Sequence, residues 1–318
     1  MTHEVSIVTA FFDIGRGNWR GFVRSNEQYL EWFKNLARLK NEMVIFTEQK
    51  FVNAILDIRT KNGLGSITTV ISCDHLFGPN GQLVETNRLL GRAMRPELHA
   101  FVRDPGCPEY WNADYVLLNL LKTVFVSIAT KLGLNANQQI AWIDFGYCRD
   151  AQRFDPNIPW QFDCGGRMNI FHIREPDDRP IFDIVRTGDV YFQGCHIVGP
   201  AECWHHLSRL VDDAMASLLA CGLVDDDQTV LLMAYRRAPD LFKIHAVDPS
   251  DWFVLFRNFK HTDVTPDTPT SCAAVSGRPD ARVAPRSPAT DSVFVGGRTF
   301  RTDSLIENIR RDCKVFRA

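Results

Sequence analysis

The first seventy residues alternate between short apolar runs and amphipathic segments, and this alternation limits the fold more than any other feature. Residues 5–12 are apolar and β-branched, which predicts a buried strand. Ser25 then precedes apolar side chains at three- and four-residue steps, which predicts a helix. Further strands are expected at residues 43–46 and 67–72, with a helix between them. We therefore expect an α/β domain with a largely parallel sheet flanked by helices.

The rest of the chain continues the pattern less regularly. Residues 74–110 show no clear periodicity, and residues 150–180 are rich in Pro, Asp and Gly, which is typical of loops. Later strands are expected at residues 139–144, 190–198, 242–247 and 252–256. Later helices are expected at residues 114–132, 201–221 and 227–235.

The composition changes after about residue 260, which sets the predicted domain boundary. Residues 262–292 are mostly Thr, Pro, Ser, Ala, Asp and Arg, a composition typical of a linker. Residues 304–316 have weak amphipathic helix character. We expect one domain over residues 4–258 and a linker with a weakly helical tail over residues 259–318. The tail is expected to be poorly ordered, or to dock on the domain, bind a partner or contact anionic lipid.

Charge and cysteine content narrow the classes of protein. A net charge of −2 argues against a nucleic-acid partner, because such proteins carry a basic surface. The sequence shows no apolar run near the roughly 20 residues of a membrane helix and no basic start typical of a signal peptide. Its nine scattered cysteines contain no Cys-x-x-Cys pair and suit free thiols. We expect a cytoplasmic protein, with the tail as a candidate contact to the inner membrane.

The ends of the predicted strands carry the first candidate site. Ligands of open α/β sheets bind beyond the carboxyl ends of the strands, and parallel strands bring these ends to one edge. Residues 9–13, 47–48 and 144–146 stand at such ends. Asp144 could hold a divalent cation against a diphosphate, or it could be a solvated aspartate in a turn.

Basic residues near the first strand and on the long helix are further candidates. Gly15 and Gly17 lack the third glycine of a dinucleotide fingerprint, so a nicotinamide site is not supported. Arg16, with the arginines four and eight residues later, could contact phosphate oxygens or form a basic surface loop. Lys122 shares a helix face with Asn119 and could present its ammonium group to a ligand or extend to solvent.

Three consecutive aspartates precede the helix expected at residues 227–235. One of them fits a helix cap, and Asp226 or Asp227 could act as a general base on a sugar hydroxyl. His245, at the end of a late strand, is either a metal ligand or a structural histidine. The sequence contains no Gly-x-Ser-x-Gly elbow, Walker lysine loop or His-Glu-x-x-His, so hydrolase and ATPase functions lack support.

Several of these segments together resemble the HtrL/YibB-like family, whose genes occur near those for lipopolysaccharide and other surface glycans. The resemblance covers about residues 4–258 and rests on residues 7–19, 29–33, 44–48, 142–146 and 226–228. The family in turn resembles GT-A glycosyltransferases, which use nucleotide sugars. The resemblance therefore implies glycosyltransferase activity and a GT-A-like (Rossmann-like) α/β fold. In this fold a mixed, mostly parallel sheet is flanked by helices, and a C-terminal tail follows.

The resemblance also implies roles for individual residues. The nucleotide sugar would contact Thr9, Ala10, Phe11, Arg16, Thr47, Glu48, Lys122, Asp144 and Gly146. Asp144, with His245, would bind Mn²⁺ or Mg²⁺. Gly146, however, stands where GT-A glycosyltransferases carry the second aspartate of their Asp-x-Asp motif. Asp227 or Asp226 would be the base of an inverting transfer.

The implied partners are a UDP-sugar donor, with UDP-galactofuranose as a candidate, and a glycan or lipid-linked glycan acceptor of O-antigen type. No nucleic-acid partner is expected. The alternative is a catalytically degenerate GT-A-like protein that serves as a binding or scaffold subunit of a glycan-assembly complex, and Gly146 is the residue that favours it.

Overall fold

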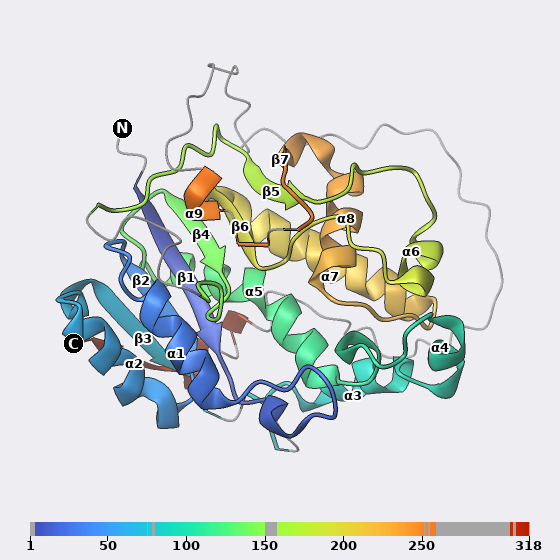
Figure 1. Cartoon of the computed structure of the whole chain (residues 1–318), viewed down its shortest axis with the longest axis horizontal. Helices are drawn as coiled ribbons and strands as arrows, with labels where there is room; N and C mark the ends of the chain where they lie inside the picture. The colour runs from blue at the N-terminus through green and yellow to red at the C-terminus, as the bar shows by residue number, and fades with distance from the viewer. Residues whose placement is uncertain are drawn as a thin grey trace.

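The computed structural model describes residues 4–74, 76–77, 80–149, 158–250, 252–253, 255–258, 306–307 and 310–317 (Figure 1). The expected linker at residues 262–292 lies outside these ranges. The strands are β1 (Val5–Phe11), β2 (Met43–Thr47), β3 (Thr68–Ser72), β4 (Gln139–Ile143), β5 (Met168–His172), β6 (His196–Pro200), β7 (Phe242–Ala246) and β8 (Lys314–Arg317). The α-helices are α1 (Asn26–Leu36), α2 (Gln49–Lys61), α3 (Val84–Ala93), α4 (Pro96–Phe101), α5 (Ala113–Lys131), α6 (Ile181–Thr187), α7 (Trp204–Ala220), α8 (Asp227–Arg237) and α9 (Leu255–Asn258).

The described strands form one mixed sheet in the order β7-β5-β6-β4-β1-β2-β3-β8. Four neighbouring strands, β3, β2, β1 and β4, run parallel. β6 runs antiparallel to β4 and to β5, and β5 is parallel to β7. The predicted α/β class with a mixed, mostly parallel sheet is therefore confirmed.

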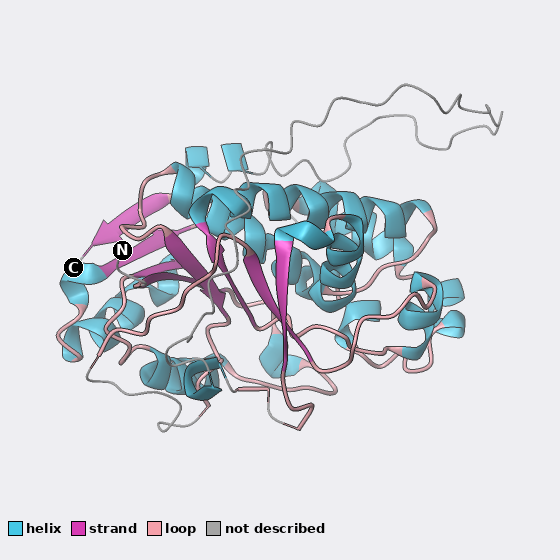
Figure 2. Ribbon diagram, turned by 90° about the horizontal axis from the view of Figure 1, so that it is seen from above, coloured by secondary structure: helices cyan, strands magenta, loops and turns pink. Residues whose placement is uncertain are grey.

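Helices cover both faces of the sheet, as Figure 2 shows. One core packs α3, α5, α7 and α8 against the sheet, and the other packs α1, α2 and α9 against its opposite face. β1 alternates between them, because Val8 belongs to the first core and Ile7 to the second. All of β1 is buried, which explains why its sequence is a continuous apolar run.

The long helix α5 is central to the first core. With 19 residues, it is long and apolar enough by composition to cross a membrane, contrary to the expectation that no segment of this chain qualifies. In the fold, however, 67% of its most apolar stretch is buried inside the protein. A continuous apolar sequence is what a helix packed on several sides requires, so its packing accounts for its composition.

Three local expectations from the sequence were wrong. The strand predicted at residues 190–198 is interrupted: Phe192 forms an isolated bridge with His172, and β6 begins only at His196. Between them, the Gly194 carbonyl accepts from Lys122 Nζ at 2.9 Å. The strand predicted at residues 252–256 is instead helical at its end, in α9. The loop-like segment at residues 150–180 contains β5, whose five residues carry too little pattern to stand out among prolines and glycines.

The end of the chain completes the sheet. Residues 306–307 and 310–312 are helical, and β8 then pairs antiparallel with β3. Ile306 is fully buried in the first core. For the described tail residues, 306–307 and 310–317, docking on the domain is the alternative observed. The expected helix over residues 304–316 is wrong for its last part, which is a strand.

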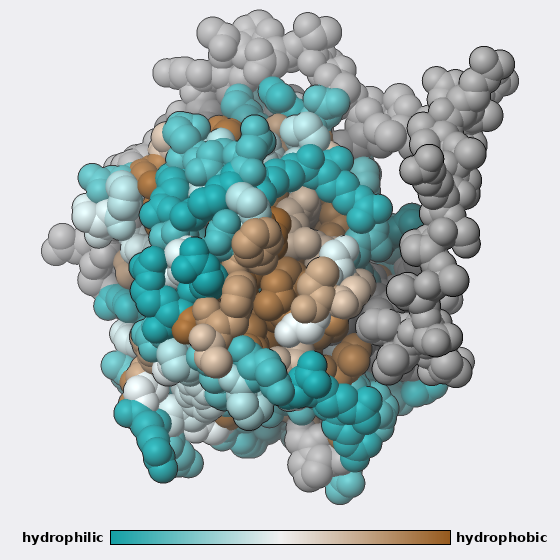
Figure 3. Space-filling view, turned by 90° about the vertical axis from the view of Figure 1, so that its right-hand side faces the viewer, coloured by the Kyte–Doolittle hydropathy of each residue, from teal (hydrophilic) through white to brown (hydrophobic). Residues whose placement is uncertain are grey.

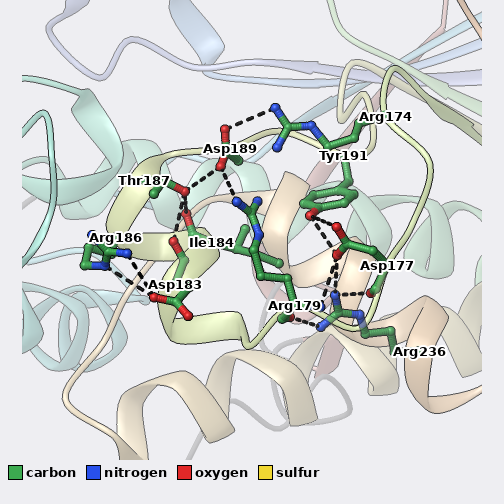
Figure 4. Close-up of polar contacts among 10 residues, drawn as sticks. All are labelled: Arg174, Asp177, Arg179, Asp183, Ile184, Arg186, Thr187, Asp189, Tyr191 and Arg236. Carbon is green, nitrogen blue, oxygen red and sulfur yellow. Dashed lines mark hydrogen bonds and ion pairs between the residues drawn. The ribbon is translucent and has the colours of Figure 1, made fainter.

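A network of arginines and aspartates anchors α8 to the segment before α6 (Figure 4). Arg236 of α8 donates from Nη1 to the Arg179 carbonyl at 2.9 Å. Arg179 in turn pairs with Asp189, with 2.7 Å between Nη1 and Oδ2. The Tyr191 hydroxyl donates to Asp177 at 2.8 Å. The C-terminal part of α8 is thereby fixed, which matters because the other end of this helix carries candidate catalytic residues.

A hollow of about 670 Å³ opens on the face formed by α4, α6, α7 and α8. Figure 3 shows apolar side chains gathered there and ringed by hydrophilic ones. Its apolar lining comes from Leu98, Phe101, Ile181, Phe182, Leu218, Leu223 and Met233. Arg95 and Glu97 also line it.

Candidate active site

A pocket of about 580 Å³ lies beyond the carboxyl ends of β1 and β4. Six predicted site residues from three parts of the chain line it: Ala10, Phe11, Arg16, Lys122, Asp144 and Gly146. The two candidate bases, Asp226 and Asp227, line it as well. This volume is in the range of small-molecule binding sites, roughly 300–1,000 Å³.

The strand ends that were expected to meet do lie at one edge of the sheet. Phe11 pairs with Thr47 in the parallel β1–β2 register, and β4 runs parallel to β1 on its other side. Thr9, Thr47 and Glu48 nevertheless do not line the pocket. The Thr47 hydroxyl donates to the Phe11 carbonyl at 2.8 Å, and Glu48 accepts from the backbone N–H of Asp13 at 2.7 Å. These two residues shape the edge of the sheet from outside the pocket.

Lys122 is the centre of the pocket's buried polar group. Its Nζ lies 3.0 Å from Asp144 Oδ1 and 2.8 Å from Asp227 Oδ2, and it also donates to the Gly194 carbonyl. Burial by itself would lower the pKa of Lys122, but the charges of Asp144 and Asp227 outweigh it and raise that pKa. A lysine that is only 5% exposed is therefore a permanent cation held by two carboxylates.

Aromatic packing fixes the position of Asp144. The neighbouring Phe145 ring stacks between Phe11 and Phe33, with centroids 4.7 and 4.2 Å away. The Trp142 indole donates to Asp144 Oδ1 at 2.8 Å, and the Asp144 backbone N–H donates to the Cys195 carbonyl. Asp144 is thus held between β4 and the segment before β6.

The three aspartates at the start of α8, Asp225, Asp226 and Asp227, have separate roles. Asp226 caps the helix, because its Oδ1 accepts from the Gln228 backbone N–H at 3.0 Å, and this confirms the predicted cap. Asp225 accepts from the Thr229 hydroxyl and from the Asp226 backbone N–H, both at 2.9 Å. Asp227 reaches Lys122 instead, so it is the aspartate committed to the buried ion group.

Burial raises the pKa of all three carboxyl groups. For Asp225, burial and the nearby Glu109 charge raise the pKa to about 7. For Asp226, burial and the charges of Asp227 and Asp225 raise it well above the ordinary value. For Asp227, burial raises the pKa and the Lys122 charge opposes this shift. Carboxylates with raised pKa values are stronger bases, and such shifts cluster at functional sites.

Two glycines make this arrangement sterically feasible. A Cβ at Gly194 would lie 2.1 Å from Asp227 Oδ2. A Cβ at Gly146 would lie 3.0 Å from ring atoms of Tyr29 and of Trp32. The position where the resemblance calls for a second aspartate is therefore covered by aromatic rings of α1, and an aspartate there would displace them.

The structure does not bring His245 into the pocket. Its Nε2 bonds Asn169 Oδ1 at 2.8 Å, and its ring stacks on Phe171. Burial lowers the pKa of His245 to about 4. Within the described ranges, no group of three or more His, Cys, Asp or Glu side chains is placed to hold a metal ion. Asp144 and Asp227 share the ammonium group of Lys122, and this positive charge makes the place unfavourable for a divalent cation.

Several pocket residues escaped the sequence reasoning. Arg149 follows β4 closely, so the rule that ligands bind beyond strand ends could have found it. Glu109 comes from the segment without periodicity, and Trp252 and Phe253 come from the segment misassigned as a strand. No local signal marks these last three residues, because their place in the pocket depends on the tertiary fold.

The fold and this pocket define a class: an α/β protein with a pocket at the carboxyl edge of parallel strands and a carboxylate–lysine–carboxylate group in its lining. Residues 3–261 match the family described as "Bacterial protein of unknown function (HtrL_YibB)". The chain belongs to this family, as its sequence segments predicted.

Two individual proteins illustrate its relationships. Protein HtrL of Escherichia coli (strain K12) is 34% identical over 285 residues, which cover 82% of this chain and 94% of that protein. The apo crystal structure of mouse xyloside xylosyltransferase 1 aligns with 76% of this chain and 84% of that chain, at 12% identity and a TM-score of 0.38. A TM-score this low establishes neither a shared fold nor a shared activity.

Proposed function

We propose that this protein is a glycosyltransferase. It transfers the sugar of a UDP-sugar donor to a hydroxyl group of a bacterial surface glycan or of a lipid-linked glycan. UDP-galactofuranose is the candidate donor on family resemblance alone. The observation that carries the proposal is the ion group of Asp144, Lys122 and Asp227, in which Lys122 and Asp227 are buried and Asp144 is partly exposed. It lies in a ligand-sized pocket at the carboxyl edge of β1 and β4.

The reaction needs a base close to the sugar, and Asp227 supplies it in this proposal. The acceptor oxygen attacks the anomeric carbon while the bond from that carbon to the diphosphate oxygen breaks. The leaving nucleotide takes the bonding electron pair, and the acceptor proton passes to the carboxylate of Asp227. A single displacement of this kind inverts the anomeric centre. Asp226 is the second candidate base, because it lines the same pocket and is also buried.

Lys122 supports this chemistry by keeping its partner charged. Burial alone favours a neutral Asp227, which cannot accept a proton, and the ammonium group at 2.8 Å counteracts that preference. Lys122 also fixes Asp227 Oδ2, so the side chain has one orientation and Oδ1 remains for the incoming proton. An ordered base in a water-poor site requires little reorganisation during the reaction.

Aromatic rings suit the neutral parts of a nucleotide sugar. Tyr29, Tyr115 and Trp252 line the pocket. Their faces can stack on a nucleobase or on the apolar face of a sugar ring. Aromatic rings and charged side chains therefore line the same pocket. This combination favours a ligand that contains both rings and charged groups, as a nucleotide sugar does.

A donor screen tests the proposal. The full chain is incubated with a panel of UDP- and GDP-sugars, released nucleotide is measured, and glycan acceptors are then tested with the best donor. Release of UDP from one sugar nucleotide, increased by an acceptor glycan, is the expected result. UDP binding without turnover of any donor would contradict transfer and support the second candidate, a binding or scaffold subunit. The observation that favours this second candidate is Gly146 in place of a second aspartate.

A further inference from the structure

Three arginines from two segments meet at the mouth of the pocket. Arg16 and Arg24 come from the segment between β1 and α1, and Arg149 follows β4. The guanidinium carbons of Arg24 and Arg149 lie 5.8 and 4.9 Å from the centroid of the same Trp32 ring. Arg16 donates from Nη1 to the Tyr29 hydroxyl at 2.8 Å. Since Tyr29 and Trp32 are adjacent on α1, the three positive groups gather over one face of that helix.

Aromatic rings and one backbone carbonyl, not carboxylates, hold these guanidinium groups. Arg16 donates from Nε to the Phe22 carbonyl at 3.2 Å. Arg149 also lies over Phe253, at 4.7 Å, and Arg16 lies over Trp19, at 5.1 Å. Among the described residues, no acidic side chain forms an ion pair with any of the three arginines. A ring contacts the flat face of a guanidinium and leaves the N–H groups on its edge able to bind oxygens.

The same arginines repel one another, which makes the site favourable for an anion. Burial lowers the pKa of Arg149, and the charges of Arg24 and Arg16 lower it further. By contrast, Arg174 and Arg179 both pair with Asp189 (Figure 4). A bound anion would reduce the repulsion between the three arginines and accept hydrogen bonds from their N–H groups.

Charge changes sign with depth in the pocket. The side chains of Asp226 and Asp227 are buried in its interior, whereas Arg149 is exposed to solvent on one side and packed against aromatic rings on the other. Asp144 and Asp227 each give one oxygen to Lys122, whose positive charge opposes the binding of a divalent cation beside it. A donor with its phosphates at the mouth and its sugar in the interior would match this distribution and would place the anomeric carbon near Asp227.

We infer that Arg16, Arg24 and Arg149 form the binding site for the diphosphate of the donor, and that their charge takes the place of a divalent cation. This inference rests on the proposed function. In the transfer step, the guanidinium groups bind the phosphate oxygens that gain negative charge as the bond to the sugar breaks. The electron pair stays on the departing nucleotide, and the positive charges of Arg16, Arg24 and Arg149 offset the negative charge that the nucleotide gains.

Calorimetric titration of the full chain with UDP and with inorganic pyrophosphate tests the inference. Both titrations are made in EDTA and again with Mn²⁺. The variants are R24Q, R149Q, their double mutant and R149K, and the matched control is R88Q, whose exposed arginine pairs with Glu85 on α3. Thermal unfolding of each variant establishes that it is folded.

We expect UDP and pyrophosphate to bind in EDTA with affinities that Mn²⁺ changes little. R24Q and R149Q should each weaken binding by about ten- to a hundredfold, because each removes a charge-assisted contact to phosphate. R149K should lose less than R149Q, since lysine keeps the charge. The salt dependence of binding should be shallower in the double mutant, and R88Q should match the wild type.

The two proposals fail in different ways. Binding that requires Mn²⁺, or that is unchanged in folded R24Q and R149Q, overturns the arginine site even if UDP-sugars are turned over. Arginine-dependent binding without turnover of any donor supports the arginine site and contradicts glycosyl transfer.

Discussion

At the scale of single residues, Gly194 is the position where the site tolerates least change. Its missing side chain lets Asp227 approach, and its carbonyl holds Lys122. G194A should displace Asp227 and reduce turnover at least about tenfold, with a loss of about 1–3 kcal/mol in unfolding free energy from overpacking. Kinetics and urea unfolding measure both effects.

The control for this substitution is G91A. Gly91 lies on α3, and a Cβ there would meet open space. G91A should leave turnover unchanged and stabilise the protein by about 0.5–1 kcal/mol. Equal turnover in G194A and G91A would contradict a role for the close approach of Gly194 to Asp227.

Asp226 and Asp227 can be separated by single replacements with asparagine. If Asp227 is the base, D227N should lower kcat by about 10²- to 10⁴-fold. UDP affinity should change little, because the proposed phosphate site is formed by the arginines. D226N should act mainly on stability through its helix cap, which accepts from Gln228 and would remain partly formed with asparagine. Near-normal turnover in both D226N and D227N would show that neither aspartate is the base of the reaction.

Asp225 makes stability depend on pH. Burial and the Glu109 charge raise its pKa from 3.8 to about 7, so between these values the folded protein binds a proton that the unfolded chain releases. This contribution to stability is complete below pH 3.8 and is lost as the pH rises through about 7. D225N keeps hydrogen-bonding groups for Thr229 and Asp226 but has no titrating carboxyl group.

Between pH 5 and pH 8, the unfolding free energy of D225N should therefore rise relative to that of the wild type by up to about 3 kcal/mol. Urea unfolding of both proteins at the two pH values measures this shift. A difference that stays constant with pH would show that Asp225 does not titrate in this range.

At the scale of elements, β8 extends the sheet with residues beyond the part of the chain that matches the family, residues 3–261. Removing residues 306–318 would expose the edge of β3 and the apolar surface under Ile306. The truncated protein should lose about 1–3 kcal/mol of unfolding free energy. It should bind UDP as the full chain does, because the pocket lies at β1 and β4.

Urea unfolding and UDP titration of the truncated protein check this prediction. V315K, a substitution at a half-exposed position of β8, serves as the control that keeps the strand. Unchanged stability after truncation would show that the pairing of β8 with β3 contributes little. Loss of UDP binding in a folded truncated protein would show that the tail supports the pocket.

Element prediction succeeded where the local pattern was long or strongly periodic. β1 and α5 follow directly from an apolar run and from an apolar helix with a glycine after its end. β5 and α9 have five and four residues, too few to show a period, and their identity depends on neighbouring strands and rings. β6 starts late, and the Gly194 carbonyl before it binds Lys122, a contact over 72 positions that local sequence cannot reveal.

At the scale of the whole molecule, the site is assembled from distant segments, which determines how much of it the sequence could predict. Residue type and position were enough to select Lys122, Asp144 and Asp227 one by one. Their meeting in one ion group depends on how α5, β4 and α8 pack together. The strand-end rule also selected Thr47, whose hydroxyl is used within the sheet. Topology identifies the correct edge, and only side-chain packing decides which residues face the ligand.

The most direct test of this account is a crystal structure of the full chain with UDP, grown in EDTA. We predict that the diphosphate lies against Arg24 and Arg149 and that the terminal phosphate points toward Lys122 and Asp227. UDP bound at any other place, or a pocket empty of UDP at concentrations that saturate binding in solution, would contradict the account.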